Sequence, residues 1–585
     1  MAWFDEAVFY HIYPLGLLGC PHENSYGEPV HRLTDLAGWV EYIADMGFTG
    51  IYIGPLFESE GHGYETTDYK KLDSRLGTNE DLKAFVADCH KRGIRVILDG
   101  VFNHTGRNFF AFRDIREHRE SSRYLGWYSG VNLGGNNSFN DGFSYDNWGG
   151  YDLLVRLNQK NPEVQDYIAD VIRFWVSEFD IDGLRLDAAD VLDFDFMRML
   201  SRVGSEVKPD FYLMGEVIHG EYIRWERDAH LHAVTNYHLH KALYSGHNDH
   251  NYFEIAHTVK RLYDMGGGDP LGLRLYNFSD NHDVERIVSR LSNRAHFRPL
   301  HILLYTLPGV PSMYYGSEFG IEGKKGGGDD WPIRPALTLK DCLADEDKRP
   351  FRELIKALCH IRTSHPCLSY GSYEQLLLTN RQYAFIRRSA DGLAVVAVNN
   401  DDSPAQVNIN VPAGRYTALI DGITVDASGG NLSYTLPPSG GDIFVPEDDG
   451  GSREADIVPP SEIKPAQPAP AVQQTQEPAP KVQQSQESAP AQKTPEQKPE
   501  PATDGQSDIQ KNAREIKKEP SQSEKTPDPV PVPSSKSYEE MTVEELQSAI
   551  LQKMAKNGPV TDDMKRSVYD NVWHDSLVNW VKSFN

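Results

Sequence analysis

An arginine and an aspartate lie two residues apart in the apolar stretch Gly183–Asp187. Side chains two apart on a β-strand point to the same face, so Arg185 and Asp187 would share one surface. A guanidinium beside a carboxylate favours the ionised carboxylate, which is one way in which a nucleophilic aspartate is activated. For this pentapeptide alone, an ordinary ion pair at the end of a strand is the more frequent explanation.

Other polar residues lie at the ends of further short apolar stretches. They are Asp99, Asn103 and His104, then Glu216, then Asn281, His282 and Asp283. Carboxylates that lie close together repel, so one tends to stay protonated while another stays ionised, as a glycosidase requires. Two of them about 5 Å apart would allow a covalent glycosyl intermediate and retention of configuration.

Two other kinds of chemistry have less support. His104, His282 and nearby acids could bind zinc, but the sequence has no HExxH spacing. No GxGxxG or P-loop sequence precedes a predicted helix, so the sequence gives no support for nucleotide chemistry.

Eight short β-rich segments before residue 366 could position these polar groups. They are Val8–Tyr13, Gly50–Ile53, Ile94–Asp99, Gly183–Asp187, Phe211–Glu216, Ala233–Tyr237, Leu273–Phe278 and Ser312–Tyr315. Longer segments with apolar residues at helical spacing lie between them, which is typical of a parallel sheet with crossover helices. Residues 1–365 are therefore predicted to form an α/β fold, a (β/α)8 TIM barrel, which would bring the carboxyl ends of its strands to one mouth.

The connection after the third predicted strand is too long for a simple crossover. Residues 104–160 are rich in Gly, Asn, Tyr and Trp, and an insertion of this size in a compact domain is usually functional. Aromatic residues such as Trp127, Trp148 and Tyr151 suit the apolar faces of sugar rings. Packing of the insertion on itself is an equally good explanation for each of them.

Three further regions follow the predicted barrel. Alternating apolar residues over 366–446 predict a small antiparallel β domain. Residues 447–536 are rich in Pro, Gln and Glu and cannot bury enough apolar surface to offset their chain entropy, which predicts a disordered linker. In 537–585, a capping box and two apolar stripes predict a module of two helices. This module would dock either on the barrel or on a separate protein partner.

Composition restricts the partners and the compartment. The formal charge of −26 argues against nucleic acid or an anionic membrane as a partner. No stretch stays apolar long enough to span a bilayer, and the first residues lack the basic and apolar parts of a signal peptide. The five cysteines have no CxxC spacing, which favours free thiols without a metal or redox function in a reducing compartment. We therefore expect a cytoplasmic protein.

Together, these segments resemble the α-amylase family of glycoside hydrolases over residues 4–446. The segments that carry the resemblance are Asp99–His104, Gly183–Asp187, Glu216, Asn281–Asp283, Gly309–Glu318, and Gly63-Tyr64 with Asp68-Tyr69. The resemblance implies that 104–160 is the family's domain B and that 366–446 is its C-terminal β-sandwich. Residues 148–158 and the pair Glu216-Val217 are similar to those of cyclomaltodextrinases and neopullulanases. The N-terminal β domain of those enzymes has no counterpart in this sequence.

The resemblance also implies roles for individual residues. Asp187 would be the nucleophile, Glu216 the general acid/base, and Asp283 the carboxylate that grips sugar hydroxyls in the transition state. Arg185 would keep Asp187 ionised. The other residues implied to bind the glucosyl unit are Tyr64, which would stack on its ring, His104 and His282, which would hydrogen-bond it, and Asp99.

Two departures from the family pattern concern calcium. The Lys-His pair of classical α-amylases is replaced here by Asp190 and Val191. The Asp that usually precedes Leu-Asn is replaced by Arg156, although Asn103 remains. We therefore expect no required cofactor and no metal site among the catalytic residues, with calcium only weakly supported.

The function implied is a retaining α-glycosidase that hydrolyses α-1,4-linked glucans or maltooligosaccharides by double displacement. An α-glucanotransferase is the near alternative, because a sugar can replace water at the same intermediate. A non-catalytic carbohydrate-binding or assembly protein is the second alternative, and the terminal helices keep it open.

Overall fold

The computed structural model describes residues 2–265, 274–326 and 329–447, with a few single residues between 461 and 553. The chain divides into two compact units, Met1–Gln510 and Lys511–Asn585. The predicted linker at 447–536 and the predicted two-helix module at 537–585 lie almost entirely outside the described residues. The described residues of that module are helical, namely Leu546, Gln547, 549–551 and Lys553.

Eight parallel strands form the central sheet of the first unit. In spatial order they are β11 (Ala233–Val234), β10 (Tyr212–Gly215), β9 (Gly183–Leu186), β5 (Arg95–Gly100), β2 (Gly50–Ile53), β1 (Phe9–Ile12), β13 (Val310–Tyr314) and β12 (Tyr276–Phe278). A parallel bridge between Thr235 and Tyr276 joins the two edges of the sheet. The sheet is therefore closed, and the predicted barrel is confirmed, with one strand overlapping each predicted segment.

Side chains of these strands fill the inside of the barrel. One buried cluster collects residues from strands all around the sheet, including Phe9, Tyr52, Ile97, Tyr212, Met214, Tyr276, Phe278 and Val310. Because parallel strands with both faces covered are buried on each side, they appear in the sequence as continuous apolar runs. The barrel is thus a packed core whose free end can carry polar groups.

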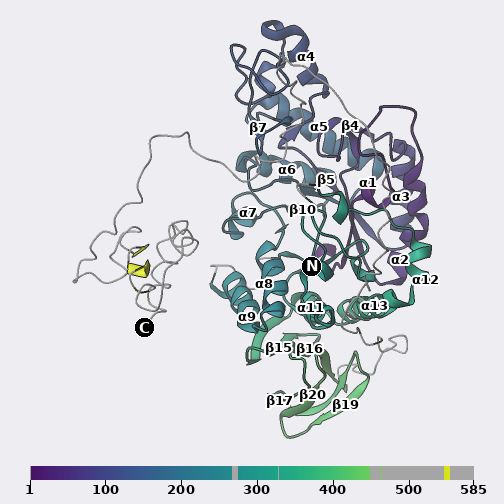
Figure 1. The fold of residues 1–585 in the computed structure, drawn as a ribbon, viewed down its shortest axis with the longest axis vertical. Helices are drawn as coiled ribbons and strands as arrows, with labels where there is room; N and C mark the ends of the chain where they lie inside the picture. The colour runs from purple at the N-terminus through teal and green to yellow at the C-terminus, as the bar shows by residue number, and fades with distance from the viewer. Residues whose placement is uncertain are drawn as a thin grey trace, which may run out of the picture. The chain divides into compact units, whose positions relative to one another are not determined.

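Helices cover the outside of the barrel (Figure 1). The longer ones are α2 (Ala37–Asp45), α3 (Asn79–Lys91), α5 (Pro162–Phe179), α6 (Phe194–Val207), α8 (Tyr237–Asn248), α9 (Tyr252–Lys260), α11 (Phe297–Thr306) and α13 (Arg349–Ser364). The short ones are α1 (Pro14–Leu17), α7 (Ile223–Arg227), α10 (Ile287–Arg290), α12 (Leu339–Ala344) and α14 (Cys367–Tyr370). No described helix is long and apolar enough to cross a membrane.

Local sequence explains where these helices begin. The side chain of Asn161 accepts a hydrogen bond from the N–H of Glu163, and Pro162 occupies the first position of α5. In the same way, Asp193 accepts from the N–H groups of Asp195 and Phe196 at the start of α6. Apolar residues at helical spacing then face the barrel, and in α5 they are Val164, Ile168, Val171, Ile172, Trp175 and Phe179.

The predicted insertion after the third barrel strand is present as a separate lobe at one end of the barrel (Figure 1). It contains α4 (Phe110–His118) and a small sheet of β6 (His104–Thr105), β8 (Tyr151–Arg156) and β7 (Asn147–Trp148), in that spatial order. Most of its aromatic residues pack on one another and are buried, including Phe112, Trp127, Tyr128, Phe143 and Tyr145. A second short hairpin, β3 (Phe57–Ser59) and β4 (Thr66–Leu72), follows β2.

An antiparallel β-sandwich follows the barrel at its other end (Figure 1). One sheet has the order β14 (Ser372–Leu378), β15 (Gln382–Ser389), β16 (Gly392–Asn399), β21 (Gly440–Pro446), β18 (Gly414–Ala418) and β19 (Ile423–Ala427). The other pairs β17 (Ala405–Asn410) with β20 (Asn431–Leu436). Residues of both sheets form one buried apolar cluster, as the predicted C-terminal domain requires.

Glu318 is a buried acid between the barrel strands and their helices. The hydroxyl of Tyr10 on β1 donates to Glu318 Oε1 at 2.6 Å. Burial raises the pKa of Glu318 to about 7. The folded protein therefore binds a proton at Glu318 that the unfolded chain has already released once the pH exceeds the usual pKa of a glutamate.

We therefore predict that Glu318→Gln stabilises the protein at pH 8 relative to wild type and gains little at pH 5. The folded state favours protonated Glu318, so wild-type stability falls as pH rises from the usual glutamate value to about 7. Thermal unfolding of both proteins at the two pH values measures this difference. Glu120→Gln, at an exposed position, is the control. A difference in melting temperature that does not change with pH would contradict the assignment.

Candidate active site

One guanidinium binds three carboxylates at the carboxyl ends of the barrel strands. Arg185 Nη1 lies 2.8 Å from Asp99 Oδ1 and 2.8 Å from Asp187 Oδ1. Arg185 Nη2 lies 2.7 Å from Glu216 Oε2. The strand register explains this meeting, because Asp99 on β5 is the direct partner of Arg185 on β9. Asp187 and Glu216 directly follow β9 and β10.

The charged groups around Asp187 shift its pKa in opposite directions. Burial raises the pKa of Asp187, and the adjacent guanidinium of Arg185 opposes this rise. The neighbouring carboxylate of Glu216 raises the same pKa further. Glu216 itself accepts hydrogen bonds from the N–H of Ala188 at 3.0 Å and from the hydroxyl of Tyr237 at 3.1 Å. Asp187 and Glu216 are therefore held by the same cation, Arg185.

The fourth acid, Asp283, follows β12, which the closing bridge places next to β11. Its Oδ2 is 3.0 Å from His282 Nε2, and its Oδ1 accepts from Arg334 Nη2 at 3.0 Å. His282 and Arg334 outweigh the effect of burial and hold the pKa of Asp283 well below its usual range. Asp283 is therefore ionised at neutral pH.

Tyr64 connects the two sides of the site. Its hydroxyl donates to Asp99 Oδ2 at 3.1 Å and also contacts His282 Nε2. The Tyr64 and His282 rings are stacked with their centroids 5.7 Å apart. The structure thus joins Asp99, Tyr64, His282 and Asp283 in one chain of contacts.

His104 completes the predicted set from the lobe side. It is buried, and burial lowers its pKa to about 3, so its imidazole is neutral. Its Nε2 atom has no hydrogen-bond partner among the described residues. A neutral, buried imidazole with an unused nitrogen is suited to hydrogen-bond a sugar hydroxyl.

Sequence reasoning missed two residues that contact the acids. Arg334, which binds Asp283, lies in a connection after β13 that carries no recognisable motif. Tyr237, which donates to Glu216, begins α8 directly after the sixth barrel strand. Its position at the carboxyl end of a strand was the available signal.

Two residues at the position that the family resemblance associates with calcium are poorly suited to this ion. Calcium needs six to eight oxygen ligands, most of them carboxylates and carbonyls. Asn103 Oδ1 already accepts from Gln159 Nε2 at 3.2 Å, and Arg156 places a cation on the neighbouring strand β8. Within residues 2–265, 274–326 and 329–447, no group of three or more His, Cys, Asp or Glu could hold a metal ion.

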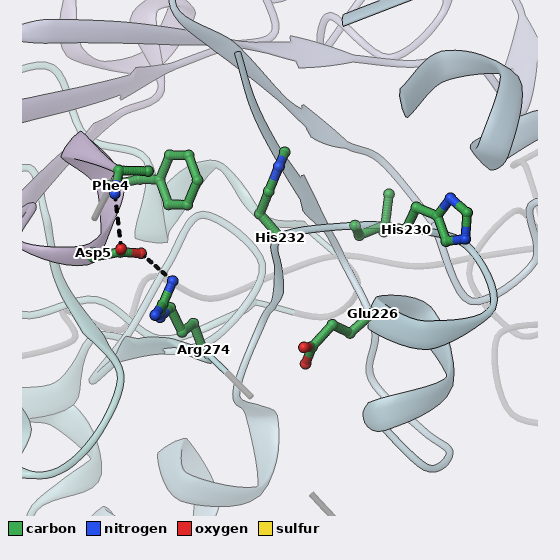
Figure 2. A pocket seen from close by; sticks show the side chains of 8 residues that line it. Phe4, Asp5, Glu226, His230, His232 and Arg274 are labelled. Carbon is green, nitrogen blue, oxygen red and sulfur yellow. Dashed lines mark hydrogen bonds and ion pairs between the residues drawn. The ribbon is translucent and has the colours of Figure 1, made fainter. Parts of the chain in front are cut away.

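A separate cavity of about 610 Å³ opens at the other end of the barrel (Figure 2). Asp5 and Arg274 form an ion pair in it, and His232 projects from the start of β11. These residues precede β1, β12 and β11, so they lie at the amino ends of the strands. The cavity is therefore distinct from the cluster of acids at the carboxyl ends.

Two family models match the chain. The model described as "Alpha amylase, catalytic domain" matches residues 23–357. The model described as "Alpha amylase, C-terminal all-beta domain" matches residues 378–448. The first match begins after β1 and includes the other barrel strands and the lobe, and the second includes β15 to β21 of the β-sandwich.

Similar proteins point to the same family. A cyclomaltodextrinase from Bacillus sp. is 30% identical over 448 residues, which cover 72% of this chain and 77% of that protein. An intracellular maltogenic amylase from Bacillus subtilis is 33% identical over 397 residues and covers 65% of each chain. The structure of the Nostoc punctiforme debranching enzyme superposes with a TM-score of 0.65 at 26% identity, covering 76% of this chain and 98% of that one. The resemblance stated from the sequence is therefore confirmed, and the chain belongs to the α-amylase family of glycoside hydrolases.

Proposed function

We propose that this enzyme hydrolyses α-1,4-linked glucans, with maltooligosaccharides or related chains as substrates, and retains the anomeric configuration. The contact of Arg185 with both Asp187 and Glu216 carries the proposal. Two carboxyl groups on one guanidinium lie close together, as in retaining glycosidases, where they are about 5–5.5 Å apart. The names of the cyclomaltodextrinase and the maltogenic amylase support the substrate class.

In the first step, an Asp187 oxygen attacks the anomeric carbon and the bond from that carbon to the leaving oxygen breaks. Glu216 donates its proton to the leaving oxygen, so a glycosyl ester on Asp187 forms and the shortened sugar departs. In the second step, Glu216 takes a proton from water, and the water oxygen attacks the anomeric carbon. The ester bond breaks and Asp187 is released as a carboxylate.

The remaining residues hold the sugar during both steps. Asp283 is ionised and can accept hydrogen bonds from sugar hydroxyls, which strengthen as positive charge develops on the ring. His104 and His282 hydrogen-bond the same sugar, and Tyr64 offers it a ring face. Arg185 favours the ionised form of Asp187 in the free enzyme.

We propose further that the enzyme acts in the cytoplasm and needs no metal ion. The relative named intracellular maltogenic amylase supports the location. Two observations support independence from metal ions. Arg156 stands where the family usually has an Asp, and Asn103 is hydrogen-bonded to Gln159.

Substitution of the two central acids tests the mechanism. Asp187→Asn and Glu216→Gln should each lower kcat on maltoheptaose roughly 10³-fold, because each removes a group that acts in the transition state. Chromatography of the products measures the rates, and circular dichroism checks the fold. Wild-type-like rates in either variant would contradict the assignment.

The same assay separates the alternatives for the wild type. Shorter sugars alone indicate hydrolysis, longer sugars indicate transfer, and unchanged maltoheptaose indicates a binding protein. NMR of the first-formed product should show the α-anomer, and a first-formed β-anomer would rule out the double displacement.

Arg334→Gln should reduce kcat/KM about tenfold, with a greater loss at pH 4.5 than at pH 7. Without this cation the pKa of Asp283 rises, so more of the enzyme carries a protonated Asp283 at low pH. Lys325→Gln is the matched control, because Lys325 pairs with Asp330, which also contacts Arg334. An equal loss at both pH values would show that Arg334 does not act through the charge of Asp283.

Removal of metal ions should leave both activity and stability unchanged. We expect the rate on maltoheptaose and the melting temperature after dialysis against EDTA to match those measured with added calcium. A calcium-dependent rise in melting temperature would show that the chain forms a metal site despite Arg156.

A further inference from the structure

Trp148 is an exposed aromatic residue beside the active site. It is 39% exposed, whereas Trp127 and Tyr128 of the same lobe are 6% and 3% exposed. The centroid of its ring lies 6.1 Å from that of His104. The sequence could not distinguish sugar-binding aromatics from packing aromatics in this lobe, and the structure separates Trp127 from Trp148 by burial.

The backbone around Trp148 is held by a tight hairpin. Trp148 on β7 pairs with Tyr151 on β8, and Gly149 and Gly150 form the turn between them. Both glycines have positive φ angles, +62° and +85°, a conformation that this two-residue turn requires and that other residues rarely adopt. The N–H of Gly150 donates to Asn147 Oδ1 at 3.0 Å. These contacts fix the position of Trp148 before any ligand arrives.

The same small sheet also carries His104. His104 on β6 pairs with Arg156 on β8, and β8 pairs in turn with β7. The backbone of Tyr64 lies close to the imidazole of His104 and opposes the lowering of the His104 pKa. Tyr64, His104 and Trp148 therefore form a connected series that leads from the catalytic acids to the lobe.

We propose that Trp148 stacks on a second glucosyl ring, adjacent to the ring held by Tyr64 and His104. The exposed indole offers an apolar face, which matches the apolar face of a sugar ring. The unused Nε2 of His104 provides a polar group at the boundary between the two sugars. Trp148 would thus make the enzyme selective for glucan chains over single glucosides, an inference that rests on the proposed function.

Two substrates that differ in length test this role. α-D-Glucosyl fluoride places one sugar ring in the site, whereas maltotriose places further rings beside it. In Trp148→Ala, we expect the ratio of kcat/KM for maltotriose to kcat/KM for the fluoride to fall about tenfold. Trp148→Phe keeps an aromatic face and should hold the ratio within about twofold of wild type.

Phe253→Ala is the matched control, because Phe253 is a similarly exposed aromatic, 47% exposed, on α9. It should leave both rates at wild-type values. Trp148→Ala with an unchanged ratio, whether both rates fall together or neither falls, would overturn the inference. A wild type that cleaves neither substrate would overturn the proposed function as well.

Discussion

The active site depends on the buried cation of Arg185. A buried guanidinium is expensive to desolvate, and so are the carboxylates around it, so each is tolerated only because the others are present. Asp99, Asp187 and Glu216 all lie within 2.8 Å of its nitrogens. Burial and the neighbouring carboxylates raise the pKa of Asp187, and the guanidinium of Arg185 opposes this rise.

The closed barrel makes this cluster possible. Asp99 meets Arg185 because β5 and β9 are neighbours in register, and Glu216 meets it because β10 is the next strand. The bridge between Thr235 and Tyr276 joins the β11 and β12 edges of the sheet and closes the barrel. It thereby brings β12, which Asp283 follows, next to β11. A shift of one residue in any of these registers would turn the side chains away from the site.

The lobe and the connection after β13 complete the site from outside the strands. His104 begins the small sheet of the lobe, so the sheet that holds Trp148 is continuous with a residue of the pocket. Arg334 comes from a connection after the last strand and fixes both Asp283 and the backbone of His282. Elements distant in sequence thus supply Arg334, His104 and Trp148, while the strands position Asp99, Asp187 and Glu216.

The sequence by itself determined the eight strands, the insertion, the β-sandwich and which acids stand at the carboxyl ends of the strands. It could do so because buried parallel strands are continuous apolar runs, and because acids at their carboxyl ends form short local patterns. The contacts of Arg334 and Tyr237 with the acids, and the exposure of Trp148, were decided only by the tertiary structure. Their contacts join residues far apart in the chain, or depend on burial, and neither property leaves a local pattern in the sequence.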